Sequence, residues 1–74
     1  MQKNDEKSVF LTLGKFLKIN DIIQSGGQAK YYLLENDILV NGIVEKRRGR
    51  KLNKGDVILI DNLEYVVEWL KKYL

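Results

Sequence analysis

The sequence contains no cysteine, no histidine and no proline among its 74 residues. Without cysteine a disulfide framework and a thiolate nucleophile are excluded, and without histidine the usual zinc sites are excluded as well. Ser8 and Ser25 have no imidazole that could activate them as nucleophiles, and no acidic residues lie at calcium-loop spacing. We therefore expect a protein that is not an enzyme and that needs no cofactor and no bound metal.

Long hydrophobic runs are also absent. The longest span four residues, at 31–34 and 57–60, whereas a membrane-spanning helix needs about 20. Residues 1–7 are polar and lack the apolar core of a signal peptide. We expect a flexible N-terminus at 1–7, one small domain at 8–74, a cytoplasmic location and no membrane partner.

Positive charge is concentrated in one segment. Residues Lys46 to Lys54 read KRRGRKLNK and hold six of the 13 basic residues with no acid, so the remainder carries seven bases against 10 acids. Three of the six are arginine, whose planar guanidinium suits phosphate contacts and stacking on bases. The segment indicates a nucleic-acid-binding patch, and the alternative is a solvated loop that only aids solubility.

A first short helix is predicted to follow Thr12. The threonine is a suitable N-cap, because its hydroxyl can accept a hydrogen bond from a free N–H group of the first turn. Leu13, Phe16 and Leu17 then repeat at i, i+3 and i+4, which is the apolar stripe of a helix that packs on one face. We expect this helix to end near Asn20.

A second helix is predicted to begin after Ser25. Ser25 and Gln28 have the S-x-x-Q spacing of a capping box, in which each side chain satisfies a free backbone N–H. The apolar positions that follow also repeat at i, i+3 and i+4: Ala29, Tyr32 and Leu33. Asn36 can stop a helix by entering the left-handed conformation, so we expect a helix of about ten residues.

Some side chains of these two helices lie off the apolar stripes. Lys15 and Lys18 are expected to face water. Tyr31 and Leu34 lie off the stripe of the second helix, where an aromatic ring can stack on a nucleic-acid base. Packing beneath the C-terminal strand is the alternative, and it is favoured in so small a domain.

The pattern then changes from helical to β. Residues 38–40 alternate, Asn41-Gly42 is a strong signal for a hairpin with a type I′ turn, and 43–45 is the expected return strand. Further strands are predicted at 8–12, 57–60 and 64–69, with one helical turn at 70–74 as a possible end.

Four groups of residues, in this order and spacing, are similar to a known family pattern. They are Leu13, Phe16 and Leu17; Ser25, Ala29, Tyr32 and Leu33; Ile38, Val40, Asn41 and Gly42; and Gly55, Asp56 and Ile58. The order resembles the S-four RNA-binding domain, named after a ribosomal small-subunit protein and also called the αL motif. The resemblance covers residues 12–60, and the length and the RRGRKL segment look most like the short stand-alone bacterial members, the YaaA type.

The resemblance implies an α+β fold with two short helices followed by a small antiparallel sheet, an extra N-terminal strand and a C-terminal strand or helical turn. It also implies that the protein binds structured RNA, either ribosomal RNA or tRNA. We expect a monomer, with the ribosome as an expected partner. The RNA would contact the start of the second helix and the segment after the hairpin: Ser25, Gly26, Gly27, Gln28, Lys30, Lys46, Arg47, Arg48, Arg50 and Lys51.

The sequence departs from the family pattern on the helical side of this surface. Thr12 replaces a common Arg, Gly14 replaces an acid, and Gly26 stands where an Arg often follows the serine. The RNA contact would then depend more on the basic segment, and charge reversal of its arginines (Arg47, Arg48 and Arg50) is expected to abolish binding and to leave the fold intact.

Two other partner classes remain open. A protein adaptor would dock through the C-terminal end of the chain, at Trp69, Leu70 and Tyr73. The second class is duplex DNA. A competition experiment between DNA and RNA of equal length would distinguish these two ligands, since only RNA has 2′-hydroxyl groups.

Overall fold

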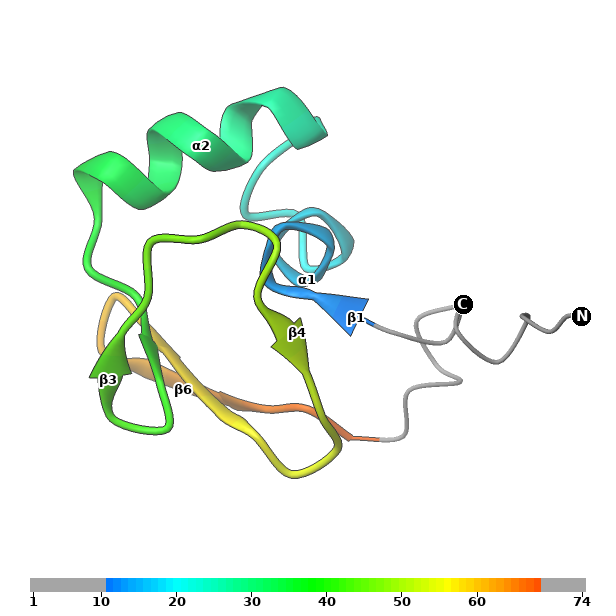
Figure 1. Ribbon diagram of the computed structural model, residues 1–74, viewed down its shortest axis with the longest axis vertical. Helices are drawn as coiled ribbons and strands as arrows, with labels where there is room; N and C mark the ends of the chain where they lie inside the picture. Colours follow the sequence, from blue (N-terminus) through cyan, green and yellow to red (C-terminus); the bar gives the residue numbers. More distant parts are fainter. Residues whose placement is uncertain (1–10, 69–74) are drawn as a thin grey trace, which may run out of the picture.

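Two helices pack over antiparallel strands in the computed structural model, which describes residues 11–68 (Figure 1). The expected α+β fold is confirmed. In chain order the elements are β1 (Leu11–Thr12), α1 (Leu13–Ile19), α2 (Gly26–Glu35), β2 (Leu39–Val40), β3 (Ile43–Val44), β4 (Lys51–Leu52), β5 (Val57–Ile60) and β6 (Leu63–Val66).

The start of α1 agrees with the sequence-based prediction. The Thr12 hydroxyl accepts a hydrogen bond from the Lys15 backbone N–H at 3.3 Å, so one free N–H of the first turn is satisfied. Leu13, Phe16 and Leu17 are buried, as the i, i+3, i+4 pattern predicts. The helix ends where it was expected to, with Asn20 as its C-cap.

The α2 helix starts at the predicted capping box, but its end differs from the prediction. The Gln28 side-chain oxygen accepts a hydrogen bond from the Ser25 backbone N–H at 3.0 Å. Asn36 is not left-handed: it is extended, with φ −129° and ψ 139°. It ends the helix through its side-chain amide, which donates to the Tyr32 carbonyl at 3.0 Å, so a side chain satisfies a carbonyl of the last turn.

The larger sheet has the strand order β3-β2-β5-β6, with antiparallel neighbours throughout. Its hairpin turn is the predicted one, because Asn41 and Gly42 have φ 53° and 85°, the positive values that a type I′ turn requires. The Asn41 side chain also accepts a hydrogen bond from the Val57 backbone N–H at 2.9 Å. One asparagine thus forms the turn and ties it to β5.

The smaller sheet pairs β1 with β4, and Leu11 lies opposite Leu52. The edge strand predicted at 8–12 is confirmed for Leu11–Thr12, and the rest of it lies outside the described residues. β4 lies within the basic segment, where no strand was predicted. The final strand starts one residue earlier than predicted and ends at Val66, while the predictions for 1–7 and 70–74 lie outside the described residues.

The core lies between the helices and the larger sheet. Leu13 and Leu17 of α1, Leu33 of α2 and Ile58 of β5 are fully buried, and the Phe16 ring packs edge-on against a sheet tyrosine. Tyr31 and Leu34 are 65% and 63% exposed, so the favoured alternative that they pack beneath the C-terminal strand is wrong for the described part of that strand. No helix within residues 11–68 is long and apolar enough to cross a membrane.

Candidate nucleic-acid interface

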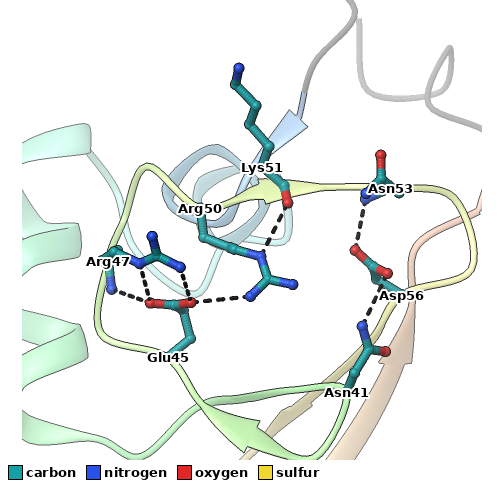
Figure 2. Close-up of polar contacts among 7 residues, drawn as sticks. All are labelled: Asn41, Glu45, Arg47, Arg50, Lys51, Asn53 and Asp56. Atoms are coloured by element: carbon teal, nitrogen blue, oxygen red, sulfur yellow. Dashed lines mark hydrogen bonds and ion pairs between the residues drawn. The ribbon is translucent and has the colours of Figure 1, made fainter.

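The basic segment folds around one buried carboxylate. Glu45 is only 8% exposed and lies between two arginines, as Figure 2 shows. Its oxygens accept hydrogen bonds from Arg47 Nε at 2.9 Å and Nη2 at 3.0 Å, and from Arg50 Nη1 at 3.2 Å. The backbone N–H of Arg47 is a further donor at 2.9 Å. The carboxylate therefore holds both guanidinium groups in fixed positions.

These donors change the acidity of the carboxyl group. The hydrogen bonds from Arg47, assisted by Arg50, lower the pKa of Glu45 to about 2, because they stabilise its charged form. The same contact raises the pKa of Arg47. Glu45 is thus ionised at any physiological pH, and it neutralises part of the positive charge that the sequence shows in this segment.

This network corrects the expectation that charge reversal of the three arginines leaves the fold intact. Glutamates at positions 47 and 50 would face the buried carboxylate of Glu45 and leave it without its donors. An unpaired buried charge is strongly destabilising. Loss of RNA binding in that variant would therefore not distinguish loss of contact from loss of structure.

The Lys46 side chain contacts the C-terminal end of α2. Its Nζ donates to the Leu33 carbonyl at 2.8 Å and to the Asn36 carbonyl at 3.2 Å. It also forms an ion pair with Asp37 at 3.1 Å. These carbonyls lie at the C-terminus of the helix, where a cation is stabilised by the helix dipole. Lys46 is thus a structural contact between α2 and the basic segment.

The loop between β3 and β4 docks on the start of α1. The Leu13 and Gly14 N–H groups donate to the Arg50 and Arg48 carbonyls, both at 2.8 Å. Gly14 permits this close approach: a Cβ there would lie 3.3 Å from both the Cβ and the carbonyl oxygen of Arg48. Arg48 also donates from Nη1 to the Gly26 carbonyl at 3.1 Å. The starts of α1 and α2 and this loop therefore meet.

A shallow groove of about 340 Å³ lies where these segments meet. Within residues 11–68 its lining holds no acidic residue and consists of Thr12, Gly14, Lys15, Lys18, Gly26, Ala29, Arg48 and Gly49. Lys15 and Lys18 were not among the predicted site residues. Their spacing at i and i+3 on the polar face of α1 was a visible signal, but only the docking of the loop shows that this face meets Arg48.

Of the other residues predicted near the start of α2 and on β4, only Gly26 lines this groove. Gly26 and Gly27 begin α2, and a Cβ atom added to either glycine would have no neighbouring atom of the described residues within 4 Å. The first turn of α2 contains no acidic residue. Lys30 is exposed on α2 and Lys51 is exposed on β4. Ser25 caps the helix, while Gln28 lies on the other side of α2 and lines a second hollow of about 410 Å³ with Tyr31. The groove and the Gln28 side of α2 are thus separate surfaces.

Comparison with known proteins identifies the family. The family described as "S4 domain" matches residues 5–68. The chain belongs to the S4-domain family. The S-four resemblance seen in the sequence is therefore confirmed, and the match covers more of the chain than residues 12–60. Within residues 11–68 of this S4 domain, no group of three or more histidine, cysteine, aspartate or glutamate side chains could hold a metal ion.

A curated relative of this S4-domain protein is known in Bacillus subtilis (strain 168). It is named "Probable ribosome maturation protein RlbA" and is 57% identical over 51 residues, which are 69% of this chain and 72% of the relative. No solved structure matches the chain.

Proposed function

We propose that this protein is a non-enzymatic RNA-binding module that contacts structured ribosomal RNA during maturation of the ribosome. The observation that carries the proposal is the groove in which Lys15, Lys18 and Arg48 meet the open start of α2. Membership of the S4-domain family supports RNA binding, and the 57% identical relative named for ribosome maturation supports the choice of ribosomal RNA over tRNA.

The groove suits the phosphate backbone of a folded RNA. Lysine and arginine side chains neutralise phosphates and release counterions, and the free N–H groups at a helix start favour an anion. Gly26 and Gly27 let a backbone approach that start without a side chain in the way. Phosphate contacts fix position and orientation and do not read sequence, so recognition depends on the shape of the RNA.

The test is a lysine variant that leaves the Glu45 network untouched. Lys15→Gln with Lys18→Gln should fold normally, because both side chains are exposed and neither has a hydrogen bond or ion pair within residues 11–68. We expect it to lose most of the ribosomal RNA that the unaltered protein captures by ultraviolet crosslinking in cells. Affinity for that RNA should fall about tenfold or more, since each phosphate contact contributes to the electrostatic term.

A matched control changes net charge equally at a distance from the groove. Ile43→Glu with Leu63→Glu also lowers the net charge by two, and these side chains are 71% and 61% exposed on β3 and β6. This control should keep its crosslinks. Equal loss of crosslinked RNA in both variants would contradict the groove as the RNA-binding site. Association with the ribosome that survives nuclease treatment would favour the protein-adaptor alternative.

A further inference from the structure

Arg47 differs from the other arginines of the segment in its exposure. Its side chain is 73% exposed although Nε and Nη2 are both bound to Glu45, whose side chain is 10% exposed. The Arg50 side chain is 33% exposed, and Arg48 donates to a backbone carbonyl at the start of α2. Arg47 alone of the three thus combines two side-chain bonds to a carboxylate with an open surface.

This geometry decides which part of the guanidinium is available. The edge that binds a phosphate through two parallel hydrogen bonds is already occupied by the Glu45 carboxylate. The hydrogen bonds to Glu45 lie in the plane of the guanidinium, so they leave its two flat faces open. The Glu45 carboxylate also cancels the positive charge that would attract a phosphate. Because Glu45 already fixes the Arg47 side chain, a base that stacks on it binds without the entropy cost of ordering a flexible arginine.

Flat, fixed guanidinium planes are a known surface for nucleobases. Sequence-specific RNA recognition uses unpaired bases that stack on aromatic rings or on arginine planes. We propose that Arg47, held in place by Glu45, is a stacking surface for one unpaired base of the bound RNA. This inference rests on the proposed function and assigns to Glu45 the role of a positioning residue.

The experiment compares two RNA duplexes that have the same number of base pairs and differ by one nucleotide in one strand. One is fully paired, and the other carries a single bulged 2-aminopurine whose fluorescence reports stacking. The unaltered protein should bind the bulged duplex more tightly, with a change in 2-aminopurine fluorescence. Arg47→Lys keeps the charge and removes the plane, so it should lower affinity for the bulged duplex about tenfold and for the paired duplex about twofold or less.

Arg48→Lys is the matched control, because it makes the same replacement at an arginine that lines the groove. It should weaken both duplexes by a similar factor. Glu45→Gln removes the charge that fixes Arg47 and should also reduce the preference for the bulge. If Glu45→Gln does not fold, the test rests on Arg47→Lys, in which Glu45 keeps the Arg47 backbone N–H and Arg50 as donors and whose folding is checked by circular dichroism.

The outcomes separate this inference from the proposed function. Equal weakening of both duplexes by Arg47→Lys would make Arg47 a phosphate contact and overturn the stacking role, while RNA binding itself would stand. An unchanged preference for the bulge in that variant would also overturn it. Failure of the unaltered protein to bind either duplex would overturn the proposed function together with the inference.

Discussion

At the scale of single residues, Glu45 makes stability depend on acid pH. Its pKa lies at about 2 in the folded protein against an ordinary value of 4.5. A carboxyl group whose pKa is lowered by folding stabilises the native state above its ordinary pKa, and this contribution is lost as pH falls through the folded value. We expect the free energy of unfolding to fall between about pH 4.5 and pH 2, measured by urea denaturation at a series of pH values.

The variant Glu45→Gln measures how much of this pH-dependent stability comes from Glu45. The variant should be less stable than the unaltered protein by about 1–3 kcal/mol at pH 7, because the arginine donors lose a charged partner. The difference between the two proteins should shrink towards pH 2. Glu64→Gln, which removes an exposed carboxylate on β6, controls for the loss of one negative charge. A difference that stays constant from pH 7 to pH 2 would contradict the role of the network.

The candidate site was only partly predictable at this scale. The charge of Arg47, Arg48 and Arg50 is visible in the sequence, but their partners are not. Glu45 stands at the end of an expected strand and gives no sign that two arginines enclose it. Lys46 reads as one more basic residue, yet it binds carbonyls 13 and 10 positions earlier in the chain. Such contacts depend on tertiary structure, which residue type and spacing do not encode locally.

At the scale of elements, the end of α2 depends on a distant lysine. Two carbonyls near its C-terminus receive hydrogen bonds from Lys46, and helix ends that lose such partners are less stable. We expect Lys46→Ala to lower the free energy of unfolding by about 1 kcal/mol. Lys30→Ala, which changes an exposed lysine on the same helix, should change it by less than about 0.5 kcal/mol. Equal effects in urea denaturation would contradict the capping role.

The helices and the hairpin were predictable because their signals are local. Caps, the i, i+3, i+4 stripes and the Asn41-Gly42 turn act within a few residues. β4 was missed because Lys51–Leu52 has no alternating pattern and becomes a strand only by pairing with β1, about forty positions away. Asn36 was assigned the wrong backbone conformation because its side chain can end a helix in two ways, and the structure uses the amide.

At the scale of the whole molecule, the distribution of charge predicts how binding responds to salt. The net charge is only +3, and Glu45 and Asp37 neutralise part of the basic segment. The cations that the proposed interface would use are instead spread over α1, α2, the β3–β4 loop and β4: Lys15, Lys18, Lys30, Arg48 and Lys51. If about four to five phosphates are contacted, the logarithm of the association constant should fall with the logarithm of salt concentration at a slope of about −3 to −4.

The salt series also separates the two kinds of contact within the interface. Lys15→Gln with Lys18→Gln should reduce the steepness of the slope by about 1 to 2, because two phosphate contacts are removed. Arg47→Lys should leave the slope unchanged, since the charge stays the same and a stacked base releases no counterions. The measurement is RNA affinity by fluorescence anisotropy from about 50 to 200 mM salt. A slope near zero in the unaltered protein would contradict phosphate contacts as the main source of its affinity for RNA.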